Sequence, residues 1–155
     1  MRITQQITDK NNKNYELQIN ISETSIPKSD LYYDVGDITH QISMFDENDF
    51  FEVEANIVIK ENEVWIHIDE LRVDESIRLL GLGTEILVII QDIAKQNNCN
   101  KIKGFLDEKG IRYFLKIDDN MDAILNLDPD LDGRIRFYLK NGFSYKAPFY
   151  VEKTI

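Results

Sequence analysis

The sequence predicts an α+β fold, in which a mixed β-sheet carries helices on its faces. Apolar and polar residues alternate with a period of two over residues 15–22, which is typical of a strand with one buried face. Residues 51–59 and 64–73 read as the two arms of a β-hairpin. A long apolar helical stretch, residues 82–96, then leads to a further strand at residues 101–106. A strand–helix–strand crossover of this length makes a parallel strand pair, so the sheet is mixed.

The remaining segments extend this sheet. Residues 3–8 are expected to pair with the strand at 15–22 through the polar turn 9–14. In the less regular stretch that follows, Asp37 is expected to cap a short helix whose apolar face consists of Ile38, Ile42 and Phe45. The chain closes on a predicted strand at residues 149–153.

Length and composition favour one domain that spans residues 1–155. The chain is 43% hydrophobic and 30% charged, and it is long enough to bury a core without disulfides or metals. Its longest purely apolar run, residues 86–90, is too short for a membrane span, and the N-terminus lacks the apolar core of a secretory signal. The single cysteine, Cys99, cannot form an intrachain disulfide, so a cytoplasmic, reducing location is expected.

The net charge of −10 narrows the choice of partners. Nucleic acids and anionic membrane surfaces bind basic patches, so neither is expected as a partner. A cationic substrate is compatible with this charge, although an acidic surface also serves solubility alone.

A glycine turn between the strand at 64–73 and the helix at 82–96 is the first candidate site. It reads Arg78-Leu79-Leu80-Gly81-Leu82-Gly83. The first N–H groups of a helix have no intrahelical partner, and the helix dipole makes that end electropositive. Glycines allow a diphosphate to approach the main chain, and Arg78 adds a charged donor. An ordinary loop before a core helix gives the same short pattern.

A second motif stands near the C-terminus, where residues 136–143 read Arg-Phe-Tyr-Leu-Lys-Asn-Gly-Phe. The two motifs, with the closing strand that contains Glu152 and Lys153, resemble the GNAT superfamily of acetyl-CoA-dependent N-acetyltransferases. The resemblance covers residues 64–106 and 135–155. It implies a mostly antiparallel sheet with a central parallel strand pair, splayed at the acetyl-CoA site, and helices on both faces.

The resemblance also implies how acetyl-CoA is held. Main-chain N–H groups of the turn would bind the diphosphate, and backbone donors at the end of the preceding strand would polarise the thioester carbonyl. The residues at these matching positions are Leu71, Arg72, Val73, Arg78, Leu79, Leu80, Gly81, Leu82, Gly83 and Thr84.

Three residues are candidates for proton transfer. Tyr138 matches the family tyrosine that protonates the leaving thiolate, and a phenol keeps its proton at neutral pH. His67 and Asp69 share one face of their strand, near the place where some members carry a general base. Glu70 and a water relay stay open as alternatives. Tyr138 and His67 can also be plain packing residues.

Other positions depart from the family pattern. Leu131 and Arg134 stand where many members carry an asparagine and a small residue, so contacts to the pantetheine arm are not transferred. Residues 107–133 form an acidic insertion with eight acidic and three basic residues, either a packing insertion or a substrate lid. Residues 128–133 resemble the start of a calcium loop, but Leu139 occupies the position of its required glutamate. Cys99 and two separated histidines give no zinc pattern, and no metal is expected.

The sequence therefore predicts an acetyl-CoA-dependent N-acetyltransferase that works by direct attack of an amine on the thioester. The expected acceptor is a cationic primary amine, either a small molecule or a lysine side chain. A homodimer stays open. The alternative is a GNAT-like module that binds acetyl-CoA or a protein partner without turnover.

Overall fold

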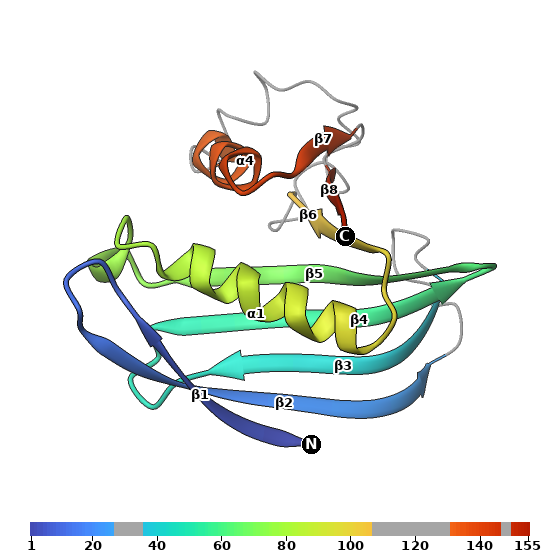
Figure 1. Cartoon of the computed structure of the whole chain (residues 1–155), viewed down its shortest axis with the longest axis horizontal. Helices are drawn as coiled ribbons and strands as arrows, with labels where there is room; N and C mark the ends of the chain where they lie inside the picture. The colour runs from blue at the N-terminus through green and yellow to red at the C-terminus, as the bar shows by residue number, and fades with distance from the viewer. Residues whose placement is uncertain (27–35, 107–130, 147–149) are drawn as a thin grey trace, which may run out of the picture.

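The computed structural model describes residues 1–26, 36–106, 131–146 and 150–155. Within these residues the strands form one sheet of eight, in the order β1-β2-β3-β4-β5-β6-β8-β7 (Figure 1). The strands are β1 (Arg2–Thr8), β2 (Asn14–Ile26), β3 (Asp37–Phe45), β4 (Phe51–Lys60), β5 (Glu63–Val73), β6 (Lys101–Phe105), β7 (Ser144–Lys146) and β8 (Tyr150–Thr154). The helices are η1 (Glu75–Ile77, a 3₁₀ turn), α1 (Leu82–Gln96) and α4 (Leu131–Lys140).

All neighbouring strands of this sheet are antiparallel except β5 and β6. The parallel register runs from Trp65 opposite Lys101 to Ile68 opposite Gly104. Helix α1 is the crossover between these two strands, because a parallel pair needs a connection that returns along the sheet. The predicted mixed, mostly antiparallel sheet with a parallel pair is confirmed.

The helix expected from Asp37 to Phe45 is wrong, because this segment is strand β3. Its register against β4 shifts between Ile38 and His40, which marks a β-bulge. The bulge turns Ile38 to the face opposite Ile42, where it packs with Val58 and Trp65. The extra residue interrupts the alternation of apolar and polar residues that is typical of a strand. The apolar residues Ile38, Ile42 and Phe45 are then spaced as on one face of a helix.

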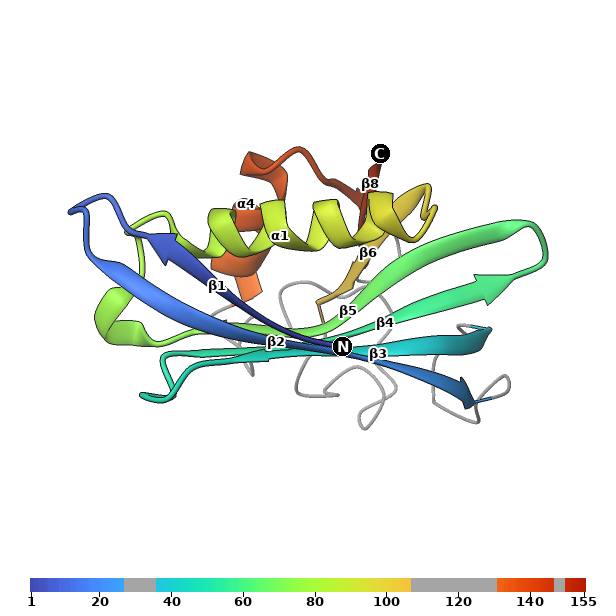
Figure 2. The same ribbon diagram turned by 60° about the horizontal axis from the view of Figure 1, so that its bottom comes forward.

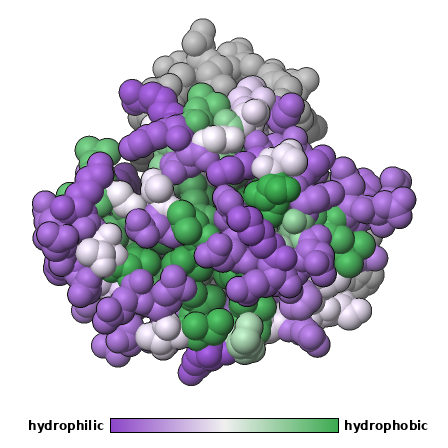
Figure 3. Space-filling model, in the orientation of Figure 1, coloured by the Kyte–Doolittle hydropathy of each residue, from purple (hydrophilic) through white to green (hydrophobic). Residues whose placement is uncertain are grey.

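Helix α1 lies along one face of the sheet, and α4 lies near the β6–β8–β7 end (Figures 1 and 2). The inner side of α1 is apolar and closes the main core against β5, β1 and β6. Its buried residues are Leu82, Ile86, Leu87, Ile89, Ile90, Ile93 and Ala94. The outer surface on this side is largely hydrophilic, with small hydrophobic patches between the charged groups (Figure 3).

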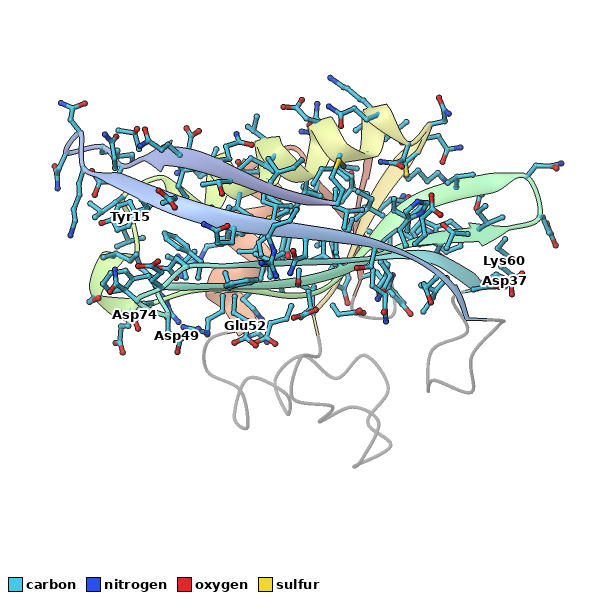
Figure 4. All side chains as sticks on the ribbon, turned by 90° about the horizontal axis from the view of Figure 1, so that it is seen from below. Tyr15, Asp37, Asp49, Glu52, Lys60 and Asp74 are labelled. Atoms are coloured by element: carbon cyan, nitrogen blue, oxygen red, sulfur yellow. The ribbon has the colours of Figure 1, made fainter. Side chains whose placement is uncertain are left out.

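Apart from the cluster of Ile38, Val58 and Trp65, the opposite face of strands β2 to β5 is largely polar, because alternate residues of β4 point away from the main core. Phe51, Val53 and Ala55 are buried, whereas Glu52 and Glu54 between them are not. Figure 4 shows Glu52 on the side of the sheet away from α1. In the described part of the chain, no helix has the length and apolarity needed to cross a membrane.

The predicted acidic insertion at 107–133 falls largely on residues 107–130, which lie outside the described residues, as does the start of the calcium-like loop. The boundaries of the predicted domain, residues 1–155, stay a prediction.

Candidate active site

The turn between β5 and α1 has the backbone shape that an anion site requires. Asp74 follows β5 and caps the short η1 turn, because its carboxylate accepts a hydrogen bond from the Ser76 N–H at 3.1 Å. Leu79 and Gly81 both adopt left-handed conformations, with φ of 65° and 83°. Gly81 is the N-cap of α1 and makes no side-chain capping bond. The first amides of α1 are therefore left for a ligand or water.

Two cations flank this turn. The Nε of Arg78 donates to the Val73 carbonyl at 3.0 Å, which fixes the base of its guanidinium beside the end of β5. The second cation is Lys10, from the turn between β1 and β2. The main-chain N–H of Lys10 donates to the Leu80 carbonyl at 3.0 Å. The Cε atom of its side chain would lie 3.5 Å from a Cβ placed on Gly81. The β1–β2 turn thus rests on the glycine turn.

Lys10 is a site residue that sequence reasoning missed. A lysine in a polar hairpin turn, far from the glycine motif in sequence, carries no signal of its own. Its position is fixed by Asp9, whose carboxylate accepts hydrogen bonds from the N–H groups of Asn11 and Lys13 and from the Tyr15 hydroxyl. These bonds hold the turn in one shape, and only the folded hairpin brings Lys10 to Gly81.

Gly83 has a packing role besides the one predicted for it. A Cβ at this position would lie 2.9 Å from the ring of Phe137 on α4. Gly83 therefore lets α4 approach the first turn of α1, close to the turn that is expected to bind the diphosphate.

Strands β5 and β6 stop pairing before β5 reaches the turn. Their parallel register ends at Ile68 and Gly104, whereas β5 continues beside β4 as far as Val73. The β4–β5 register shifts here, with Glu54 opposite Glu70 and Ala55 opposite Ile68, so Asp69 is an extra, bulged residue. Such bulges redirect side chains and are common beside active sites. The predicted donors Leu71 to Val73 lie on the part of β5 beyond the β6 pairing.

The expected shared face of His67 and Asp69 is confirmed, since His67 Nε2 lies 3.6 Å from Asp69 Oδ1. Asp69 also accepts a hydrogen bond from the Asn56 amide at 2.6 Å. His67 is only 2% exposed. Burial, with a smaller effect of the Lys103 charge, lowers the pKa of His67 to about 4. The imidazole is therefore neutral at pH 7 and is a weak base.

Carboxylates gather on the same face as His67 and Asp69. Partial loss of hydration, followed by repulsion from Glu52, Glu70 and Asp69, raises the pKa of Glu54. Burial and repulsion from Glu52 likewise raise the pKa of Glu70. Arg72 offsets part of this charge, because its guanidinium contacts Asp49 at 2.9 Å and Glu52 at 3.4 Å.

Tyr138 lies near the point where β5 and β6 separate, on the face of the sheet opposite His67 and Asp69. Its ring is 4% exposed and packs edge-on against Phe137 and Phe143. A Cβ on Gly104 would lie 3.5 Å from its hydroxyl oxygen. Gly104 is paired with Ile68, whose side chain lies in the main core. Tyr138 thus stands on the core side of the point where β5 and β6 separate, and His67 and Asp69 stand on the opposite side.

Arg134, one of the two positions that depart from the family pattern, has a structural role. The guanidinium of Arg134 donates to the Leu106 carbonyl at 2.9 Å and so holds the end of β6. Burial raises the pKa of the Cys99 thiol to about 11, which makes it unreactive. Among the described residues, no group of three or more side chains is arranged to hold a metal ion.

No family model and no curated protein matches the sequence. Solved structures do match. The PaiA N-acetyltransferase of Thermoplasma acidophilum, solved in complex with coenzyme A, is 15% identical, with a TM-score of 0.46 over 74% of this chain and 60% of that one. A GNAT-family acetyltransferase of Staphylococcus aureus is 13% identical, with a TM-score of 0.47 over 74% of this chain and 66% of that one.

A Klebsiella pneumoniae protein assigned as an acyl-CoA N-acyltransferase is 15% identical, with a TM-score of 0.45 over 88% of this chain and 97% of that one. GNAT-family acetyltransferases are therefore among the solved structures that this chain resembles, as its motifs predicted. The chain spans 60% of the length of the Thermoplasma protein. At these identities and TM-scores the likeness says nothing of activity, and the fold described above rests on this chain's own strand order.

Proposed function

We propose that this protein is an acyl-CoA-dependent N-acyltransferase that uses acetyl-CoA and transfers the acetyl group directly to a primary amine. One observation carries the proposal: a glycine turn of the phosphate-binding type, flanked by Arg78 and Lys10, follows strand β5, whose parallel pairing with β6 ends earlier, at Ile68. The diphosphate would sit on the first amides of α1, which leaves the acyl chain to enter the gap between the two strands.

The reaction needs three groups around the thioester. The amine nitrogen attacks the carbonyl carbon, and backbone donors of residues 71–73 stabilise the oxyanion that forms. The attacking nitrogen then loses its second proton to solvent, and collapse of the intermediate breaks the carbon–sulfur bond and releases the coenzyme thiolate. The Tyr138 hydroxyl gives its proton to that thiolate, and solvent later returns a proton to the phenolate. The products are an amide and free coenzyme A.

The amine must lose a proton before it attacks. We assign this proton to Asp69, which hydrogen-bonds Asn56 and is beside His67 at the end of the paired part of β5. Neutral His67 can relay a proton through a water, but its pKa of about 4 makes it a poor acceptor on its own. The amine enters from the polar face of the sheet and Tyr138 acts from the core face.

The acceptor is proposed to be cationic in its resting form. Glu54 and Glu70 lie on the face from which it would enter, and desolvation, followed by repulsion from neighbouring carboxylates, raises the pKa of each; a cation would relieve that repulsion. A cytoplasmic location stays a prediction that rests on the sequence.

Two measurements test the proposal. Isothermal titration with acetyl-CoA should show binding, and thiol release should appear when primary amines are added. Absence of binding would overturn the assignment. Binding without thiol release over a broad amine library would favour the rival function, a non-catalytic module that binds acetyl-CoA. The weak basicity of His67 is the observation that supports this rival.

A further inference from the structure

A hollow of about 380 Å³ opens on the polar face of the sheet, away from α1. Its walls come from four consecutive strands, β2 to β5. They are lined by Asn20, Ser22, Gln41, Ile42, Ser43, Glu54, Asn56 and Asp69. Because neighbouring strands lie ~4.8 Å apart, the hollow extends roughly 14 Å across the sheet from β2 to β5.

The two ends of this hollow differ in charge. On β4 and β5 it is bounded by the carboxylates of Glu54 and Asp69. Repulsion from Asp69 is one of the causes that raise the pKa of Glu54, so a cation bound between them would lower the energy of both carboxylates. This end suits an ammonium group.

On β2 and β3 the lining is uncharged, and all of its residues except Ile42 carry amides or hydroxyls: Asn20, Ser22, Gln41 and Ser43. These groups both donate and accept hydrogen bonds. The carbonyl oxygen of Asn20 accepts a bond from the Arg2 guanidinium at 3.1 Å, which leaves its NH₂ group for a ligand. An apolar tail laid here would strip water from these groups without replacing their hydrogen bonds, whereas a hydroxyl-bearing tail would replace them.

The charged end adjoins the reaction centre. Asp69 follows Ile68, the last residue of β5 that pairs with β6. An ammonium held by Asp69 would therefore lie at the edge of the gap that is proposed to take the thioester. The amine end points toward the acyl group, and the tail runs back across β4 and β3.

From this arrangement we infer that the hollow is the acceptor site, and that the acceptor is a small primary amine with a neutral, hydroxyl-rich body, of the amino-sugar type. The inference rests on the proposed function and narrows its acceptor from amines in general to this class. Simple alkylamines and protein lysines, whose tails are apolar or bulky, fit the neutral end poorly.

Three probes of equal ring size test the inference: glucosamine, cyclohexylamine, which lacks the hydroxyls, and glucose, which lacks the amine. In thiol-release assays at saturating acetyl-CoA, kcat/KM for glucosamine should exceed that for cyclohexylamine by roughly tenfold or more, because a site built for hydrogen bonds rejects an analogue without them. Glucose should inhibit only weakly, since it leaves the carboxylates without a cation.

Variants separate the two ends of the hollow. Gln41→Ala and Ser43→Ala, both on β3, should raise KM for glucosamine several-fold and leave KM for cyclohexylamine unchanged. Glu54→Gln should raise KM for both amines. Asp92→Asn, on the exposed side of α1 across the sheet, is the matched control and should change neither.

Equal kcat/KM for the two amines, or a KM for glucosamine that does not respond to Gln41→Ala and Ser43→Ala, would overturn the inference. That result differs from failure of the proposed function, in which acetyl-CoA would not bind or no amine would release thiol. Circular dichroism of each variant should match the wild type, because the substituted side chains lie on the polar face outside the main core.

Discussion

The ring of Tyr138 is held by packing, and its hydroxyl is the group that is proposed to donate a proton. Its ring packs with Phe137 and Phe143, and its hydroxyl lies at Gly104. We expect Tyr138→Phe to lower kcat roughly tenfold or more and to leave the affinity for acetyl-CoA unchanged, because only the proton donor is removed. Steady-state kinetics with calorimetric titration would measure both. If kcat is unchanged, Tyr138 is a packing residue and the thiolate takes its proton from water.

Lys10 adds a prediction that the glycine motif alone does not make. We expect Lys10→Ala to weaken acetyl-CoA binding several-fold, because a lysine beside a phosphate contributes a charge-assisted hydrogen bond. Lys13→Ala, in the same turn, should have a smaller effect and serves as the control. Titration with coenzyme A and with dephospho-coenzyme A would show which phosphate Lys10 contacts. Equal affinities for the Lys10→Ala variant and the wild type would remove Lys10 from the site.

At the scale of elements, the regular segments were predictable from sequence and the irregular ones were not. The strand at 15–22 and the helix at 82–96 have a clean period, because each buries a single continuous face. Strand β3 was missed because its bulge changes the face after Ile38, and no sequence pattern encodes that shift. No sequence pattern indicated the bulge at Asp69 either, although this bulge shapes the candidate site.

The same contrast holds within the candidate site. The turn from Arg78 to Gly83 was predictable because its chemistry belongs to consecutive residues. Lys10 and the hollow across β2 to β5 were not, because they form only when distant strands pair.

Contact between α1 and α4 depends on a single glycine. We expect Gly83→Ala to destabilise the protein by about 1–3 kcal/mol, because its Cβ would overlap the ring of Phe137. Gly133→Ala is the matched control within α4, since nothing lies within 4 Å of a Cβ there. That substitution should stabilise the helix by about 0.5–1 kcal/mol. Urea unfolding of both variants would measure the free energies, and equal effects would contradict the proposed packing role. Because substitutions at Gly83 would also disturb the packing against Phe137, they are poor probes of phosphate binding.

For the whole molecule, buried His67 predicts loss of stability in mild acid. Its pKa falls from 6.5 to about 4 on folding, so the unfolded chain binds the proton more tightly. The contribution is fully present above pH 6.5 and is lost as the pH falls toward 4. When the pH is lowered from 7 to 5, the free energy of unfolding of the wild type should fall by about 2 kcal/mol more than that of the His67→Gln variant. Urea titrations at both pH values would measure this difference. Parallel pH profiles for the two proteins would show that His67 is not buried in its neutral form.

The net charge of −10 should act on the acceptor before it binds. Glu54, Glu70 and Asp69 lie on the face from which the amine is proposed to enter, and their field attracts a cation from solution. Salt screens such a field over roughly 10 Å at 0.1 M. With acetyl-CoA saturating, so that its own charge does not enter the rate, kcat/KM for the amine should fall about threefold or more between 0.02 and 0.5 M salt. Glu54→Gln should flatten this dependence, and Asp92→Asn, on the other side of the sheet, should keep it. A rate that does not change with salt would mean that these carboxylates only solvate the sheet, and the acceptor would then be recognised without its charge.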